Sequence, residues 1–249
     1  MALCHVQWFS QVLAKQVGTY VILPDGGKPP FATFYLLHGL SDDYTIWHRR
    51  TRIEWYVREL PLIVVMPDGF RGFYTDNDTG PQYHKYICEE LVEFVERSFP
   101  ARRDRKARCI GGLSMGGYGA LRQALACPEV YASVNSHSGA LMHGGKTYTR
   151  RDLAEFRRVF GARPKGTDHD LVYLASQAKT FDDLPKIRID CGTEDYLLED
   201  NRKFHGLLEK MQIPHEYAEY PGAHNWDYWD THIQEALAFH AKNLRLKKS

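Results

Sequence analysis

The residues with the clearest chemical potential are a serine and the glycines on either side of it. The segment 112–116 reads Gly-Leu-Ser-Met-Gly, after an apolar stretch at 108–113 and before a stretch of helical spacing at 115–126. A serine on such a strand-to-helix turn presents its hydroxyl as a nucleophile, and flanking glycines relieve the crowding at the turn. Nucleophilic chemistry at Ser114 is favoured over phosphate binding, because the spacing is neither GxGxxG nor GxxxxGK[ST].

A serine hydroxyl becomes a good nucleophile only when a base takes its proton and a third group orients that base. His224 is the predicted base, because Gly-Ala-His-Asn at 222–225 reads as a loop between the last strand and the last helix. The acid should precede it in the chain, just beyond the end of a strand. Asp195 is the preferred acid, Glu194 is the fallback, and Asp190 lies within the predicted strand itself.

Backbone N–H groups are expected to bind the oxyanion that forms when a serine attacks a carbonyl carbon. One donor should be Met115, the residue after the serine, and the other should come from the His-Gly turn at 36–41. Leu40 is the candidate in that turn, and Gly39 is the near alternative. For His38, a structural role in shaping the turn is expected rather than a catalytic one.

Three aromatic residues could line a pocket for the acyl or alcohol group: Trp47, Tyr74 and Trp226. Simple packing in the core is an equally good reading of each. No metal is expected at the site, because no HExxH or comparable ligand spacing occurs and the chemistry needs none. No other cofactor is predicted.

The elements that must position these residues alternate between short apolar runs and amphipathic stretches from about residue 30 onward. The predicted strands are Phe31–His38, Leu62–Asp68, Arg108–Leu113, Tyr131–Ser136, Lys186–Cys191 and the half-exposed His215–Tyr220. The predicted helices are a stripe from Tyr83 to Val95, then Met115–Ala126, Glu199–Met211 and Thr231–Leu244. This order predicts an α/β fold with a mostly parallel sheet and helices on both faces.

Two segments depart from that alternation. Val6–Val12 and Val17–Leu23 predict two strands joined by a turn, which we expect to form an antiparallel N-terminal edge of the sheet. Residues 141–180 have the weakest periodicity, and we expect a compact, cap-like insertion over the top of the sheet rather than a second domain.

Composition narrows the class of protein without naming its activity. The chain has 249 residues, 43% of them hydrophobic, and its net charge of +1 follows from 32 basic and 31 acidic residues. These values exclude a disordered tail and a collagen-like chain. They also supply no field that would attract nucleic acid or an anionic membrane. Five scattered cysteines without a CxxC pair predict neither a disulfide framework nor a structural zinc site.

No targeting signal is recognisable in the sequence. The first ten residues have no basic segment followed by an apolar one, and the apolar runs are far shorter than the roughly 20 residues of a membrane span. We therefore expect a cytoplasmic protein with no membrane partner, although a secreted chain trimmed of its signal peptide would read the same.

Five motifs, taken in order, resemble the Putative esterase family of α/β-hydrolases. This family includes tributyrin esterases, esterase D (S-formylglutathione hydrolase), feruloyl and acetylxylan esterases and mycolyltransferases. The motifs begin at Leu36, Ile63, Gly112, Cys191 and Gly222, and Phe73–Asp76 and His224–Trp229 place the chain nearest the small bacterial tributyrin esterases. The resemblance implies one α/β-hydrolase domain over 1–249, with Ser114, His224 and Asp195 as nucleophile, base and orienter.

The expected function is hydrolysis of short-chain acyl esters, with a small-molecule ester as the partner. S-formylglutathione hydrolysis is an alternative, disfavoured because Leu113 stands where those enzymes usually carry histidine. Acetylxylan or feruloyl ester hydrolysis and acyl transfer would use the same residues. A catalytically silent fold used for binding is disfavoured, because all three residues of the triad are present. The oligomeric state stays open, a homo-oligomer included.

Overall fold

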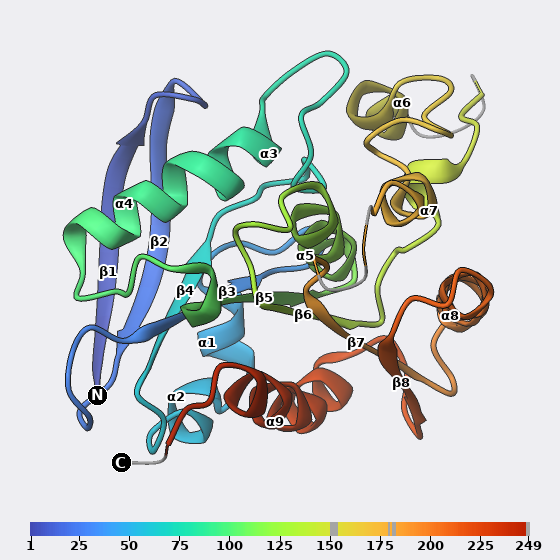
Figure 1. Ribbon diagram of the computed structural model, residues 1–249. Coiled ribbons are helices and arrows are strands. Elements are labelled where there is room, and N and C mark those ends of the chain that lie inside the picture. The colour runs from blue at the N-terminus through green and yellow to red at the C-terminus, as the bar shows by residue number, and fades with distance from the viewer. Residues whose placement is uncertain (150–153, 179, 181–182, 248–249) are drawn as a thin grey trace.

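The strands of the protein form one sheet in the order β1-β2-β4-β3-β5-β6-β7-β8 (Figure 1). The computed structural model describes residues 1–149, 154–178, 180 and 183–247. The strands are β1 Ala2–Ser10, β2 Lys15–Leu23, β3 Ala32–Leu37, β4 Leu62–Pro67, β5 Arg108–Leu113, β6 Ser133–His137, β7 Lys186–Gly192 and β8 His215–Tyr220.

The sheet is parallel from β4 through β3 and β5 to β8, and its N-terminal edge is antiparallel. Every residue of β3 and β4 is buried, as expected for inner strands covered on both faces. Strand β1 alternates between exposed and half-buried residues, because it lies at an edge. The predicted mostly parallel sheet with an antiparallel edge is therefore confirmed. Strand β1 starts at Ala2 rather than Val6, since it pairs with β2 along its whole length.

Helices cover both faces of the sheet. Around β3 and β5, α3, η1 and α4 pack together with α5 and α8 on one face, whereas α1, α2 and α9 pack on the other (Figure 1). The helix bounds are α1 Ile46–Arg50, α2 Ile53–Tyr56, α3 Tyr83–Lys85, π-helical η1 Tyr86–Glu90, α4 Leu91–Ser98, 3₁₀-helical η2 Arg105–Ala107, α5 Met115–Ala126, 3₁₀-helical η3 His143–Gly145, α6 Ala154–Phe160, α7 Leu171–Ser176, α8 Leu198–Lys210 and α9 Trp226–Asn243.

Helix α9 begins at Trp226, earlier than the predicted start at Thr231. The side chain of Asn225 accepts a hydrogen bond from the Tyr228 N–H and so caps the helix. An asparagine in this position stabilises an N-terminus that apolar spacing alone does not reveal. Within the described residues, no helix is both long enough and apolar enough to span a membrane.

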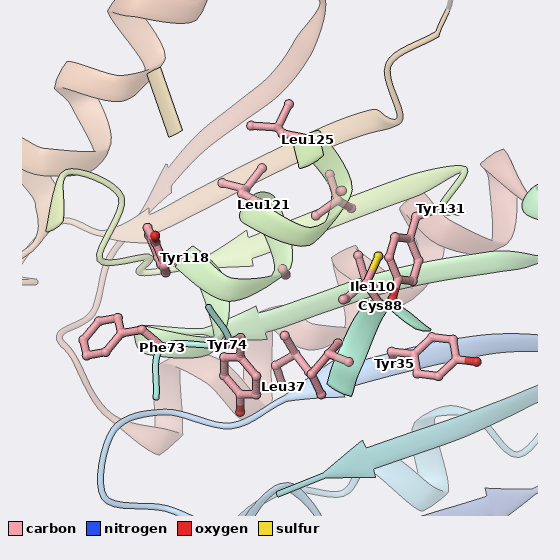
Figure 2. Packing of buried hydrophobic residues seen from close by; sticks show 14 of the residues in the cluster. Tyr35, Leu37, Phe73, Tyr74, Cys88, Ile110, Tyr118, Leu121, Leu125 and Tyr131 are labelled. Atoms are coloured by element: carbon pink, nitrogen blue, oxygen red, sulfur yellow. The ribbon is translucent and has the colours of Figure 1, made fainter. Parts of the chain in front are cut away.

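The core on the α5 face is rich in aromatic side chains. Figure 2 shows Tyr118, Leu121 and Leu125 of α5 in the same cluster as Leu37 and Ile110 of the sheet. Tyr74 belongs to this cluster and is fully buried. The core therefore extends to the residues that support the N-terminal end of α5.

The segment 141–180 contains η3, α6 and α7, and its residues 150–153 and 179 lie outside the described part of the chain. It packs beside α5, where the Tyr118 hydroxyl donates to the His169 carbonyl at 2.6 Å. Arg71 also connects it to the His-Gly turn, because its guanidinium binds both Glu155 of α6 and the Ser41 hydroxyl.

The turn between β5 and α5 depends on very close backbone contacts. Ser114 has φ 53° and ψ −115°, a conformation that side-chain-bearing residues rarely adopt. A Cβ atom on Gly116 would lie 2.5 Å from the Leu37 carbonyl oxygen and 2.6 Å from that of His38. A Cβ on Gly112 would lie 2.7 Å from the Gly116 carbonyl oxygen. Only glycine at these two positions lets α5 start so close to the end of β3.

Replacing Gly116 with alanine should destabilise the protein, because the new methyl group meets backbone atoms that cannot rotate away. We expect Gly116→Ala to lower the free energy of unfolding by about 1–3 kcal/mol, measured by urea denaturation. Gly206→Ala is the matched control, since nothing lies within 4 Å of its Cβ position in α8. This control should be neutral or gain up to about 1 kcal/mol of stability. Equal stability of Gly116→Ala and the wild type would contradict the close contact.

Candidate active site

Ser114 lies at the carboxyl end of β5, where it directly precedes α5. Its N–H donates to the His137 carbonyl of the neighbouring strand, and its own carbonyl accepts from Tyr118 and Ala140. The residue is 8% exposed, which leaves its hydroxyl at the surface of a tightly held turn. The backbone, rather than the side chain, therefore fixes the position of the hydroxyl.

His224 joins Ser114 to Asp195 through hydrogen bonds. Its Nε2 lies 3.1 Å from the Ser114 Oγ, and its Nδ1 lies 2.8 Å and 3.0 Å from the two carboxylate oxygens of Asp195. A carboxylate only accepts, so Nδ1 carries the proton and the Nε2 lone pair faces the serine hydroxyl. The structure thus brings together the three residues that the sequence predicted, in the orientation that proton transfer from Ser114 requires.

The Asp195 carboxylate is stabilised in its charged form. Its side chain is fully buried. Burial raises the pKa of Asp195, but hydrogen bonds from His224, the Leu197 N–H and Ser138 outweigh burial and hold that pKa below its ordinary value. The Leu197 N–H donates at 2.8 Å. Asp195 is therefore an ionised partner for the imidazole at neutral pH.

Glu194, the fallback acid, has a different position. Its carboxylate accepts from the Gly222 N–H at 2.7 Å, and its own N–H donates to the Gly222 carbonyl at 2.9 Å. These two bonds fasten the loop that carries His224 to the loop that carries Asp195. The geometry gives Glu194 a role in holding the loops, not in contacting the imidazole.

The His-Gly turn lies against the serine. A Cβ atom on Gly39 would be 3.7 Å from the Ser114 Cβ. The Gly39 N–H is hydrogen-bonded to the Asp42 carboxylate, whereas the Leu40 N–H has no acceptor in the part of the chain that the structure describes, so Leu40 remains available to an oxyanion. His38 accepts from the Gly69 N–H through Nε2, and its Nδ1 donates to the Gly39 carbonyl. Both ring nitrogens thus shape the turn, which is the structural role predicted for His38.

Two of the predicted pocket residues are instead part of the core. Trp47 is 1% exposed and donates from Nε1 to the Leu37 carbonyl at 3.0 Å. Tyr74 is fully buried, and its hydroxyl donates to the His38 carbonyl at 3.1 Å. These bonds leave no polar atom of either side chain facing a substrate. The pocket assignment of Trp47 and Tyr74 is wrong, because both support the backbone next to Gly116.

Aromatic residues do surround the imidazole. The half-buried Trp226 packs edge-on against Trp229, whose ring in turn lies edge-on to His224 at 4.9 Å. Tyr196 lies with its ring 4.5 Å from the His224 ring and is 76% exposed. Trp226 thus stays a candidate pocket residue. Tyr196 was not predicted, although its position directly after Asp195 was an available signal.

The sequence also did not predict a buried polar cluster that lies below the site. Asp190, which lies in β7, accepts from the Tyr228 hydroxyl at 3.0 Å and pairs with His137 at 2.8 Å. Next to it, the Ser138 hydroxyl binds both Asp195 and the Trp229 indole. The motif Ser-His-Ser-Gly at 136–139, at the end of a strand, could have indicated this support.

The described residues include one group with metal-ligand geometry, namely His84, Cys88 and Cys127. It lies at the opposite end of α5 from Ser114 and has no part in the arrangement around the serine.

Tyr74→Phe should separate a supporting role from a pocket role. Loss of the bond to the buried His38 carbonyl should lower the free energy of unfolding by about 1–3 kcal/mol. The ratio of KM values for acetate and butyrate esters should stay unchanged, because the ring does not contact substrate. Tyr173→Phe on the exposed side of α7 is the control and should be neutral. A changed KM ratio with unchanged stability would restore Tyr74 to the pocket.

Comparison with known proteins gives the family. The profile of the Esterase family, described as "Putative esterase", matches residues 10–240. An acetyl esterase of Caldicellulosiruptor saccharolyticus is 31% identical over 263 residues, which cover 97% of this chain and 99% of that protein.

Two solved structures have the same fold as this chain. FphF, a fluorophosphonate-binding serine hydrolase of Staphylococcus aureus, superposes with a TM-score of 0.86 at 31% identity, covering 96% of this chain and 98% of that one. The S-formylglutathione hydrolase FrmB of the same organism superposes with a TM-score of 0.85 at 32% identity and equal coverage. The chain therefore has the α/β-hydrolase fold, belongs to the Putative esterase family and is an esterase, a carboxylic ester hydrolase.

Proposed function

We propose that the protein hydrolyses short-chain acyl esters through an acyl-enzyme on Ser114, with His224 as general base and Asp195 as its orienter. The observation that carries the proposal is the continuous line of hydrogen bonds from Asp195 through His224 to Ser114. The line needs no added group to make the serine nucleophilic.

Acylation begins when Ser114 Oγ attacks the ester carbonyl carbon and His224 Nε2 takes its proton. Asp195 stabilises the imidazolium that forms, since its carboxylate accepts from Nδ1. The carbonyl oxygen becomes negative and accepts from the N–H groups of Met115 and Leu40. The imidazolium then protonates the leaving alcohol, and an ester between the acyl group and Ser114 remains.

Deacylation repeats these steps with water. His224 takes a proton from the water that attacks the acyl-enzyme, and the same two N–H groups stabilise the second oxyanion. Collapse of this intermediate breaks the bond to Ser114 Oγ, which recovers its proton from the imidazolium. Tyr196, whose ring packs against the imidazole, and Trp226, which packs against Trp229 beside it, would contact the alcohol or acyl group.

The preference for short acyl chains is supported by the acetyl esterase relative, at 31% identity. Hydrolysis of S-formylglutathione is a second candidate, supported by the 32% identity with FrmB. Its acyl group is also short, so the two candidates differ in the leaving group. Acetylxylan or feruloyl ester hydrolysis and acyl transfer to an alcohol would use the same residues.

We further propose that the chain acts as a single α/β-hydrolase domain with 141–180 as an insertion. The eight strands of the described residues belong to one sheet, and the residues of the site come from both halves of the chain. Helix α7 contacts α5, and Glu155 of α6 binds Arg71. These contacts support an insertion that packs on the same domain.

Ser114→Ala should abolish turnover of p-nitrophenyl acetate and leave the unfolding transition unchanged. Removal of the nucleophile typically costs a factor of roughly 10⁶ in kcat. Ser176→Ala, the same substitution at an exposed residue of α7, should keep full activity. Activity of Ser114→Ala near the wild-type level would refute the proposed nucleophile.

A substrate series should identify the preferred acyl and leaving groups. We expect kcat/KM for p-nitrophenyl esters to be highest for acetate to butyrate and to fall with longer chains. S-formylglutathione and methyl ferulate belong in the same series. A maximum at a long acyl chain would contradict the short-chain assignment, and a kcat/KM for S-formylglutathione far above that of the esters would favour the thioesterase.

A further inference from the structure

A second group of chemically capable side chains lies at the far end of α5. His84 of α3, Cys88 of η1 and Cys127 each offer one ligand atom, and these atoms lie within 4.8 Å of one another. Cys88 is 4% exposed, whereas His84 and Cys127 are half-buried. Figure 2 shows Cys88 among the buried residues of the core. The group therefore has a closed side against the core and a side that a small solute can reach.

Two elements bring these residues together. His84 and Cys88 are four positions apart, so they lie on the same side of the helix that passes from α3 into η1. The π-helical geometry of η1 is uncommon and is often found at functional sites. Cys127 is the C-cap residue of α5. The cluster thus joins two helices that are far apart in sequence.

The hydrogen bonds around His84 fix its tautomer. The side-chain amide nitrogen of Gln123 donates to the Tyr74 carbonyl at 2.5 Å, so the amide oxygen faces His84. This oxygen accepts from His84 Nδ1 at 2.5 Å. The proton is therefore on Nδ1, and the lone pair of Nε2 faces the Cys127 Sγ at 3.8 Å. Metal-binding histidines are oriented in this way by an acceptor on the other ring nitrogen.

Charges near the cluster also suit a cation. The Glu129 carboxylate acts electrostatically on both sulfur atoms. The Arg122 guanidinium acts on Cys88, but Asp168 pairs with it at 2.8 Å and offsets its positive charge.

We propose that His84 Nε2, Cys88 Sγ and Cys127 Sγ bind one Zn²⁺ ion, with a water molecule as the fourth ligand. Two thiolates and one imidazole are ligands that zinc prefers, and the thiol protons pass to solvent when the metal binds. Tetrahedral bonds of about 2.3 Å to sulfur and about 2.0 Å to nitrogen place these atoms about 3.5 Å apart. The 3.8 Å between Cys127 Sγ and His84 Nε2 needs only a small adjustment to reach that value.

Bound zinc would fasten η1 to the C-terminal end of α5, the helix whose N-terminal end follows Ser114. Gln123 connects the metal ligand His84 to the Tyr74 carbonyl, and the Tyr74 hydroxyl supports the His38 carbonyl. Within the described residues, none of the three ligands is hydrogen-bonded to Ser114, Asp195 or His224, so we assign the metal a structural role. The sequence lacks a CxxC pair, which explains why spacing alone predicted no such site.

Cobalt provides the test, because Co²⁺ replaces Zn²⁺ and absorbs light when thiolates bind it. Chelator-treated, fully reduced protein is titrated with Co²⁺ and followed by absorption spectroscopy. We expect one equivalent to bind, with a thiolate-to-cobalt charge-transfer band that Zn²⁺ then abolishes. Zn²⁺ alone should raise the melting temperature of the wild type.

Two variants and one control complete the experiment. Cys127→Ser and His84→Ala should each weaken binding by more than about 100-fold, beyond the loss typical of an outer-shell change. Cys4→Ser, the same cysteine substitution in β1, should bind like the wild type. Circular dichroism and retained esterase activity verify that each variant is folded. Absence of the charge-transfer band in the wild type, or its persistence in folded Cys127→Ser, would overturn the proposal.

Discussion

The close approach of α5 to the end of β3 is the constraint on which the site depends. Gly116 lies against the Leu37 and His38 carbonyl groups so tightly that a single methyl group would not fit. This contact holds Ser114 at a positive φ, a conformation that costs about 1–3 kcal/mol and persists only where its surroundings enforce it. Trp47 and Tyr74 donate to these same two carbonyl groups, so large core side chains hold the surface on which the turn is built. The packing of the core therefore fixes the position of the reacting serine.

The other loops of the site are held by hydrogen bonds to carboxylate groups. Glu194 fastens the loop of His224 to the loop of Asp195, and buried Ser138 binds the Asp195 carboxylate from the neighbouring strand. Because all of these loops follow the carboxyl ends of adjacent parallel strands, they meet at the same edge of the sheet. The fold places residues from three distant parts of the sequence within hydrogen-bonding distance. The hydrogen bonds between the loops then hold these residues in place.

The parts of this arrangement that follow local rules could be predicted from the sequence. The bounds of β5, α5 and β8 match their predictions, because an apolar run marks β5, glycines mark the start of α5, and the alternation of residue types marks β8. The approach of Asp195 and His224 to Ser114 was also predicted, since chain order and strand ends constrain it. The roles of Trp47 and Tyr74 were not, because an aromatic residue in a core and one in a pocket look alike in sequence. The cluster of His84, Cys88 and Cys127 depends on the packing of two helices, which no local spacing encodes.

Peptide mass spectrometry after reaction with a fluorophosphonate shows directly whether Ser114 is the activated nucleophile. Such a reagent is attacked by an activated serine and leaves a covalent phosphonate on it. We expect one adduct per chain, located on Ser114, and its loss when His224 is replaced by alanine, because the hydroxyl then has no base. An adduct on another residue, or undiminished labelling of Ser114 in His224→Ala, would contradict the proposal that the Asp195–His224–Ser114 line performs the reaction.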